Sequence, residues 1–404
     1  MTDVKNIIIV NDFAFINGGT AMVAINSAIG LSKFGYNVTF FSSVGPISSE
    51  LTSAGINVIC LNQNDILNDN SRVRAIMNGL WNGKAYRELK ILLKNANNVD
   101  TIVHVHGWTK ALSPSIWKAI KSENIKSVVT LHDFFLSCPN GGFYNYRRNM
   151  ICSIKPCSFK CYSNNCDSRS YFHKIWRFNR QLIQNYFLQR ISDLSAIYIS
   201  NLNKEVLFPY LKNSIQNWYY LQNPIEKIDM PDIDIENNEY YIYIGRISKE
   251  KGVEMFCESI TELGLKGIVV GDGYLKNKLE NRFKNIIFTG WLNSKQKVLV
   301  INKAKALILS SLWYETFGLV VAEMKLAGIP CLVPDRCAAS EQIINYKNGL
   351  IYRIGDKTSL KEKIIEFEKS NIYSFKSYLR DNCNLYTLND HVNDLLKIYN
   401  KMLS

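Results

Sequence analysis

The alternation of short apolar segments with helix-compatible segments, which runs through the chain twice, most constrains its fold. In the N-terminal half, strand-like apolar runs occur at residues 7–10, 37–41, 57–61, 101–105, 127–131, 196–199 and 218–221. Strands that are buried on both faces are near-continuously apolar, and the strands of a parallel sheet are joined by helices. The pattern therefore predicts a doubly wound α/β domain, with one long helix over 72–94 among those that cover its sheet.

The alternation stops near residue 223 and begins again near residue 239. The intervening stretch combines Asn-Pro and Pro-Asp with acidic and amide residues, a composition typical of a linker. Apolar runs then resume at 240–244, 267–270, 285–288, 306–309 and 331–333. Because 404 residues are also many for a single core, we predict two Rossmann-like α/β domains facing across a cleft. Their expected bounds are 1–223 and 239–380, joined by a linker at 224–238.

The overall charge restricts the classes of partner. A formal net charge of +13 indicates anionic partners, which are nucleic acid, an anionic membrane face or phosphorylated small molecules. No run of eighteen uncharged apolar residues is present, and the N-terminus lacks the layout of a signal peptide. We therefore expect a cytoplasmic protein. No recognised nucleic-acid motif supports nucleic acid as the partner.

One segment, residues 171–190, is both basic and aromatic. It contains four Lys and Arg residues and no acidic residue, together with six aromatic side chains. This composition is typical of a helix that lies on an anionic membrane surface. It is equally typical of a core helix with a basic solvent face, and the sequence leaves both readings open.

Two carboxylates, Glu315 and Glu323, lie at a predicted strand–loop–helix junction within residues 311–323. In open α/β sheets, ligands bind at the carboxyl ends of the strands, where this junction falls. Two carboxylates suit a ligand rich in hydroxyl donors, such as a ribose and a sugar. A solvated helix face that happens to carry acidic residues is the alternative reading.

Three further strand ends carry residues that suit a phosphate. Gly18-Gly19 precedes the first helix, Gly245-Arg246 begins the loop that leads to Lys251, and Gly271-Asp272-Gly273 follows the next strand. Glycines permit close approach of the backbone, and an arginine fork with a lysine can bind a diphosphate. Each of these features alone can be an ordinary turn, but together they favour a ligand site.

These motifs resemble those of the retaining, nucleotide-sugar-dependent glycosyltransferases of family 4 with GT-B architecture, of the bacterial surface-polysaccharide type. The resemblance spans nearly the whole chain, and it is strongest in the second half. The residues that carry it are Gly245, Arg246, Glu250, Lys251, Gly252, Gly271, Gly273, Glu315, Thr316, Phe317, Gly318, Glu323, Gly328, Pro330, Glu341, Asn348 and Gly349.

The resemblance implies a role for each donor-side residue. Arg246 and Lys251 would hold the diphosphate, Glu315 would contact the transferred sugar, and Glu323 would contact the ribose. Gly245, Gly271 and Gly273 would allow backbone approach, and the helix start at Thr316, Phe317 and Gly318 would direct its amides at the distal phosphate. Catalysis would rest on His132, Glu315, Arg246 and Lys251.

The first half has corresponding acceptor-side positions. Gly18 and Gly19 resemble the glycine-rich loop over the diphosphate, and His132 resembles the histidine beside the reacting sugar. His106 and Asp133 are the acceptor-binding candidates. A buried structural histidine is the alternative for His132. The C-terminal segment, residues 381–404, would form a helix that crosses back to the N-terminal domain.

The chain also departs from the family pattern. The run Cys337-Ala338-Ala339-Ser340 stands where the family often has a Gly-Gly pair, which leaves the donor sugar open. The one Asp-x-Asp, Asp232-Ile233-Asp234, falls in the linker, so we expect no catalytic metal. Cations and helix amides would neutralise the leaving diphosphate, and front-side attack would retain the anomeric configuration.

Five cysteines cluster in a predicted insert at about 134–170. Cys152, Cys157, Cys161 and Cys166 have a spacing that a structural zinc site can use, with Cys138 nearby. Free thiols are the close alternative, and disulfides are disfavoured in a reducing cytosol.

We therefore predict a transferase that moves a hexosyl group from a UDP- or GDP-linked sugar to a hydroxyl of a glycan or lipid-linked acceptor. It would work peripherally at the anionic inner face of the cell membrane. The alternative is a GT-B protein that only binds, hydrolyses or epimerises a nucleotide sugar. A basic nucleic-acid-binding protein is the remote alternative.

Overall fold

The computed structural model describes residues 3–225 and 233–404, and these form two compact units. The first unit comprises Met1–Gly142, Ser153–Pro224 and Tyr386–Ser404, and the second comprises Phe143–Cys152 and Ile225–Leu385. Much of the predicted linker, 226–232, lies outside the described residues and includes Asp232. No helix in the described residues has the length and apolarity that a bilayer crossing needs.

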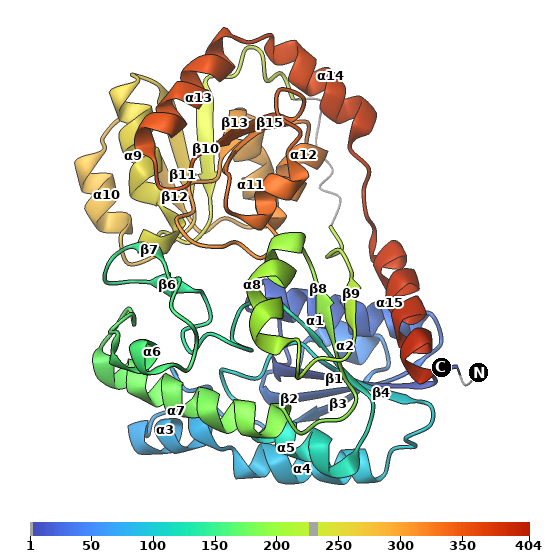
Figure 1. The fold of residues 1–404 in the computed structure, drawn as a ribbon. Coiled ribbons are helices and arrows are strands. Elements are labelled where there is room, and N and C mark those ends of the chain that lie inside the picture. The colour runs from blue at the N-terminus through green and yellow to red at the C-terminus, as the bar shows by residue number, and fades with distance from the viewer. Residues whose placement is uncertain (1–2, 226–232) are drawn as a thin grey trace. The chain divides into compact units, whose positions relative to one another are not determined.

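The first unit is built on a seven-stranded parallel sheet with the order β3-β2-β1-β4-β5-β8-β9 (Figure 1). Of its central strands, β4 and β5 are buried along their whole length and β1 at all but its two end residues, as the apolar runs predict. Its elements are β1 (Asn6–Phe13), α1 (Gly19–Lys33), β2 (Asn37–Val44), α2 (Ser49–Ser53), β3 (Asn57–Cys60), α3 (Arg72–Leu80), α4 (Gly83–Lys94), β4 (Thr101–Val105), α5 (Ser115–Glu123), β5 (Ser127–Thr130), α6 (Phe159–Ser163), α7 (Tyr171–Leu188), β8 (Leu194–Tyr198), α8 (Asn201–Leu211), β9 (Trp218–Tyr220) and α15 (Leu388–Leu403).

The second unit is built on a six-stranded parallel sheet with the order β12-β11-β10-β13-β14-β15. A two-stranded antiparallel hairpin, β6 (Tyr144–Asn145) and β7 (Met150–Ile151), is grouped with it. The remaining elements are β10 (Tyr240–Ile244), the 3-10 turn Lys249–Lys251, α9 (Val253–Glu262), β11 (Lys266–Val270), α10 (Lys276–Arg282), β12 (Ile286–Gly290), α11 (Ser294–Ile301), β13 (Ala304–Ile308), α12 (Leu319–Leu326), β14 (Cys331–Pro334), the 3-10 turn Ala338–Gln342, β15 (Gly349–Tyr352), α13 (Lys357–Lys369) and α14 (Ile372–Asn382).

The predicted pair of doubly wound parallel sheets is confirmed, but the single long helix over 72–94 is wrong. The structure divides this segment into α3 and α4, because Trp81 adopts an extended conformation between them. The side chain of Asn82 then accepts a hydrogen bond from the amide of Ala85 at 3.1 Å and caps α4. The side-chain oxygen of an asparagine at this position accepts from one of the unpaired N–H groups at the start of a new helix. This capping interaction favours a helix start at Asn82 over continuation of the preceding helix.

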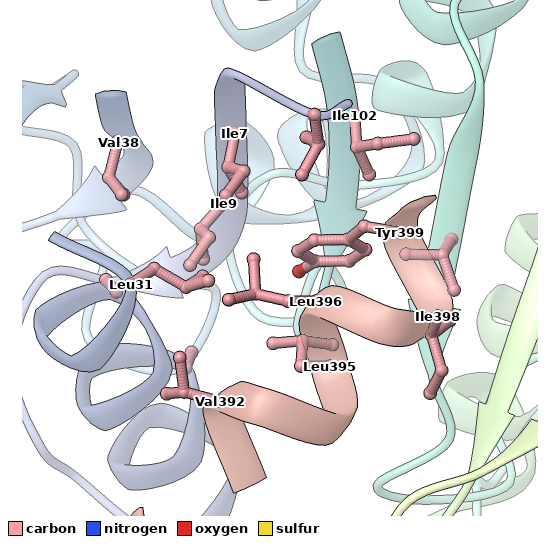
Figure 2. Close-up of a cluster of buried hydrophobic side chains, with 14 of the residues drawn as sticks. Ile7, Ile9, Leu31, Val38, Ile102, Val392, Leu395, Leu396, Ile398 and Tyr399 are labelled. Atoms are coloured by element: carbon pink, nitrogen blue, oxygen red, sulfur yellow. The ribbon is translucent and has the colours of Figure 1, made fainter. Parts of the chain in front are cut away.

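The C-terminal helix α15 packs into the core of the first unit (Figure 2). It begins with a reciprocal capping box between Thr387 and Asp390. Its apolar side chains, including Val392 and Leu395, then lie against α1 and against the face of the sheet that β1 forms. A helix from the end of the chain therefore completes the hydrophobic core that the first residues begin.

We expect Leu395→Ala to lower the free energy of unfolding of the first unit by about 2–5 kcal/mol, because the fully buried side chain leaves a cavity. Urea denaturation followed by tryptophan fluorescence measures the change. Asn393→Ala, on the exposed face of the same helix, should change stability by no more than about 0.5 kcal/mol. Equal effects of the two substitutions would show that α15 does not contribute to the core.

Candidate active site

In the second unit, the predicted ligand residues gather at the carboxyl edge of the sheet. β10 pairs with β11 on one side and with β13 on the other, and all three strands are parallel. The loops that follow these strands carry Arg246 and Lys251, then Gly271, then Glu315. Neighbouring parallel strands end at the same edge, which is where doubly wound sheets bind ligands.

Glu315 and Lys251 form an ion pair at this edge. Lys251 Nζ donates to Glu315 Oε1 at 2.7 Å, and the two side chains are 22% and 13% exposed. Ser311 Oγ also donates to Oε1, and Trp313 Nε1 donates to it at 3.1 Å. The Lys251 ammonium lies 5.2 Å from the centroid of the Trp313 ring, so the ring face supports the same cation.

The ionised form of Glu315 is the stable one, and one of its oxygens is available. Burial favours the neutral acid, but Lys251 and the hydrogen bonds to Oε1 outweigh it and hold the pKa of Glu315 below its ordinary value. All three side-chain donors converge on Oε1, and Oε2 accepts no hydrogen bond from the described residues. The carboxylate is therefore fixed through one oxygen, while the other can accept from a ligand hydroxyl.

Glu323 lies on the helix that follows Glu315. Gly318 caps α12 in the left-handed conformation with φ of 84°, and a Cβ there would lie 2.7 Å from the Cβ of Ala339. The helix therefore begins four residues after Glu315 in the sequence. The free N–H groups at the start of a helix favour binding of an anion. Glu323 is half-buried in α12 and pairs with Lys297 of α11.

Arg246 is held by a carboxylate of its own loop and is 59% exposed. Its guanidinium donates to Glu250 Oε1 at 2.9 Å, and Ser248 Oγ donates to the same oxygen at 2.8 Å. Gly271 lies against the preceding loop, because a Cβ at this position would be 2.0 Å from the carbonyl oxygen of Gly245. The packing of two loops therefore requires this glycine whether or not a ligand approaches. Gly273 lies in the same loop, before α10.

In the first unit, three histidines form a column at the ends of β4 and β5. His104 bonds to Tyr399 Oη of α15 at 2.6 Å and to Thr130 Oγ1 at 2.7 Å. His106 Nδ1 lies 2.9 Å from His132 Nε2, and the two rings are stacked. Burial keeps the pKa of His132 at about 3 and those of His104 and His106 well below their ordinary values. The column is therefore neutral near pH 7.

Asp133 follows His132 in the sequence, and Asp12 lies nearby in the fold. The two carboxyl groups differ in the number of hydrogen bonds that they accept from backbone amides. Burial raises the pKa of Asp133 to about 6, against the hydrogen bond that its Oδ1 accepts from the amide of Phe135 at 2.9 Å. The carboxylate of Asp12 is buried and accepts three backbone N–H bonds from residues 110–112.

Gly18 and Gly19 are exposed at the start of α1, and the space beside Gly18 is open.

The predicted zinc site is wrong. Within residues 3–225 and 233–404, no three His, Cys, Asp or Glu side chains are grouped so that they could hold a metal ion. Cys152 ends the segment Phe143–Cys152 that belongs to the second unit, whereas Cys157, Cys161 and Cys166 belong to the first. A lysine, Lys174, donates to Cys161 Sγ at 3.2 Å, where a metal would have to approach. All ten cysteines are free thiols.

Sequence reasoning missed several residues that fix the predicted ones. Ser311 and Trp313 orient Glu315, Lys297 pairs with Glu323, and Glu250 holds Arg246. Ser311 and Trp313 lie within four residues of Glu315, so the sequence contained a signal for them. Lys297 lies on another helix, 26 residues before its partner, and no sequence pattern indicates that contact.

Comparison with known proteins finds a family match for the part of the chain that forms most of the second unit. Residues 226–385 match the family described as "Glycosyl transferases group 1". An uncharacterised 41.2 kDa protein in the cps region of Klebsiella pneumoniae is 24% identical over 168 residues, which are 39% of this chain and 45% of that protein. A GDP-mannose-dependent alpha-mannosyltransferase of Mycobacterium tuberculosis is 25% identical over 28% of this chain and 30% of its own length. The chain thus spans less than half the length of these two relatives.

Solved structures extend the likeness of fold to the whole chain. A glycosyltransferase from Rickettsia africae has a TM-score of 0.68 at 19% identity, over 99% of both chains. The sucrose-phosphate synthase of Thermosynechococcus elongatus has a TM-score of 0.70 at 14% identity, over 98% of this chain and 99% of that one. HepE of Anabaena, solved in complex with UDP, has a TM-score of 0.64 at 14% identity, over 98% of this chain and 100% of that one.

The fold is thus that of the GT-B proteins, as predicted. Residues 226–385 match the group 1 glycosyltransferases, in agreement with the family that the sequence motifs predict.

We expect His132→Gln to make the first unit less sensitive to acid. A histidine whose pKa falls to about 3 on folding contributes stability above its unfolded pKa, and that contribution is lost as the pH falls from about 6.5 toward 3. Between pH 7 and pH 5, the free energy of unfolding of the wild type should therefore fall by about 1–2 kcal/mol more than that of the variant, as measured by urea denaturation. In His173→Gln, at an exposed position of α7, the free energy of unfolding should fall by as much as in the wild type. An unchanged slope in His132→Gln would contradict the buried neutral state.

Proposed function

We propose that this protein transfers a hexosyl group from a UDP- or GDP-linked sugar to a hydroxyl of a glycan or lipid-linked acceptor, with retention of configuration. The observation that carries the proposal is Glu315, which is fixed by three donors on Oε1 and has Oε2 available for the sugar. It lies at the carboxyl sheet edge, within the region that matches the group 1 glycosyltransferases.

On the donor side, residues 239–380 bind the nucleotide sugar. Lys251 keeps its pair with Glu315 and directs its remaining N–H groups at the diphosphate, while the Arg246 fork binds from the exposed side. The α12 amides after Gly318 bind the distal phosphate, and Glu323 accepts from the ribose. These groups neutralise the leaving diphosphate without a catalytic metal.

On the acceptor side, residues 1–223 hold the attacking hydroxyl. His132 is neutral and borders Asp133, so it can exchange a hydrogen bond with the acceptor or with a hydroxyl of the sugar without adding charge. His106 lies behind His132 and positions its ring. The acceptor oxygen attacks the anomeric carbon on the face that the diphosphate leaves, and the leaving phosphate takes the proton.

A nucleotide-sugar assay tests this proposal. UDP- and GDP-linked sugars are supplied with lipid-linked oligosaccharide acceptors in buffer containing EDTA, and release of nucleoside diphosphate is measured with and without acceptor. We expect acceptor-dependent release, and we expect Glu315→Gln to lower kcat/KM about 100-fold or more, because the neutral amide loses the pair with Lys251. NMR of the product should show the donor's anomeric configuration.

The control for this assay is Lys361→Ala on α13, which removes a partly exposed ion pair with Glu262 of α9 and should leave turnover unchanged. Release that is equal without acceptor would indicate a hydrolase, and an isomerised nucleotide sugar would indicate an epimerase. Near-normal turnover in Glu315→Gln would contradict the donor-site assignment.

We also propose that the first unit docks on the anionic inner face of the cell membrane through α3, α6 and α7. These helices lie side by side (Figure 1), and Trp176 Nε1 of α7 donates to the carbonyl oxygen of Ile76 in α3 at 3.1 Å. They expose large apolar side chains, namely Phe159 (84%), Phe172 (83%), Val73 (73%) and Met77 (61%). Residues 153–190 contain seven Lys and Arg residues and one acidic residue, and Lys155, Lys160, Arg169 and Arg190 are exposed, so the segment has a basic surface.

We expect co-sedimentation with phosphatidylglycerol vesicles and much weaker co-sedimentation with phosphatidylcholine vesicles. The double substitution Phe159→Ser and Phe172→Ser should weaken vesicle binding about tenfold or more, because both side chains lose apolar burial in the lipid. Tyr373→Ser, which changes an aromatic side chain that is 51% exposed on α14, should bind as the wild type does. Equal binding of all three proteins would contradict the docking surface.

A further inference from the structure

Two cations of the first unit lie beside the proposed acceptor residues without an anionic partner. Arg180, in α7, is 5% exposed, and among the described residues its guanidinium makes one hydrogen bond, which Nη1 donates to the carbonyl oxygen of Thr109 at 2.9 Å. Lys110 follows Thr109 in the chain, and its ammonium forms no ion pair within 3–225 and 233–404. Arg177, one turn before Arg180, differs because it pairs with Asp167 at 3.3 Å. Since buried charges in proteins are as a rule paired, Lys110 and Arg180 favour binding of an anion.

Three elements of the first unit fix the position of these two cations. The loop after β4 carries Lys110, whose backbone amide donates to Asp12 Oδ2 at 2.8 Å. The ring centroids of Phe135, in the loop after β5, and of Trp176, in α7, are each 5.2 Å from Arg180 Cζ. Aromatic rings at this distance stabilise a guanidinium without neutralising its charge. Arg180 is therefore positioned before a ligand arrives.

The pKa values of the two cations indicate a recess in the protein surface. Lys110 is exposed, yet burial, together with Arg177 and Arg180, lowers the pKa of its ammonium. Burial, followed by the effect of Arg177, lowers the pKa of Arg180 to about 10. A side chain that solvent reaches, but that the protein still removes from bulk water, lies in a concave position. The charged form of each cation is less stable there than in water, and an anion would stabilise it.

The two carboxyl groups nearby do not form ion pairs with these cations. Asp12 accepts its hydrogen bonds from three backbone amides of residues 110–112. Asp133 accepts from the amide of Phe135, and burial raises its pKa to about 6 against the opposite effect of Lys110 and Arg180. Among the described residues, neither carboxyl group lies within 4.0 Å of a cationic nitrogen. The direct contacts of the guanidinium and the ammonium with an anion therefore remain to be made by a ligand.

We propose that Lys110 and Arg180 bind an anionic group, a phosphate or a carboxylate, that the acceptor carries. This inference rests on the proposed function, because it places the ligand on the acceptor side. His132, which is proposed to meet the acceptor, directly precedes Asp133 in the loop that carries Phe135. A guanidinium binds two oxygens of a phosphate or a carboxylate through paired N–H groups, and an ammonium adds a point charge. The bound anion positions an acceptor hydroxyl near His132 and selects against neutral glycans.

Three monosaccharides that differ in one group test the charge requirement. Isothermal titration calorimetry compares glucose 6-phosphate, glucuronate and glucose on the whole protein, without a nucleotide sugar. At least one of the two anions should bind about tenfold or more tightly than glucose, and Lys110→Met should weaken its binding about tenfold, as expected for the loss of one charged hydrogen bond. Lys110→Arg, which keeps the charge, should retain most of the affinity. Lys33→Met, at an exposed position of α1, should bind as the wild type does.

The preferred anion distinguishes the two sources. Tighter binding of glucose 6-phosphate indicates an acceptor phosphate, and tighter binding of glucuronate indicates an acidic sugar. Anions also suit the proposed donor cations Arg246 and Lys251, so the effect of Lys110→Met assigns the site. Failure of both anions to bind more tightly than glucose, or anion binding that Lys110→Met leaves unchanged, overturns the proposal.

A second measurement applies if Lys110→Met does not fold, as judged by circular dichroism. Arg180→Lys keeps the charge but removes the paired N–H groups, so it should weaken binding of the preferred anion several-fold and leave glucose binding unchanged. Unchanged anion binding in Arg180→Lys would then overturn the proposal. The binding experiments need no sugar transfer. A protein that binds these anions but releases no nucleoside diphosphate would refute the proposed function and not the anion site.

Discussion

The packing of α15 in the first unit is the constraint on which the histidine column and the proposed acceptor site depend. The helix completes the core that β1 and α1 begin, and its Tyr399 bonds to His104 within that core. The ring of His104 in turn contacts that of His106, with 4.0 Å between the ring centroids, and His106 bonds to His132. The last turns of the chain therefore fix the position of a histidine that lies more than 250 residues earlier in the sequence. Because the column is buried and neutral, it can be rigid without a counter-ion.

The proposed donor site depends on a different interaction, the ion pair between Lys251 and Glu315. Each residue alone would be an uncompensated charge in a partly buried position, whereas together they hold each other in a fixed geometry. The pairing of β10 with β13 makes this possible, because it brings together two loops that are far apart in the sequence. The hydrogen bonds of this pair and its neighbours all go to one carboxylate oxygen of Glu315, which supports the proposed donor site.

Periodicity predicted most of the fold because parallel strands must be apolar and must alternate with helices. The prediction was wrong at 72–94, where Asn82 caps a new helix within a pattern that is helical on both sides. It was wrong again for zinc, because spacing alone cannot show that Cys152 belongs to another compact unit or that a lysine lies beside Cys161. The contacts of Lys297 and Tyr399 were missed because their partners lie on other elements.

The sequence by itself determined the two α/β sheets and which loops carry Arg246, Lys251, Glu315 and Glu323, because local chemistry and strand–helix alternation are written along the chain. Only the tertiary structure decided which of these residues are paired, which oxygen of Glu315 accepts the hydrogen bonds, and that Lys174 lies beside Cys161. Such facts depend on distances between elements, and burial then sets the charge of each group through the cost of removing it from water.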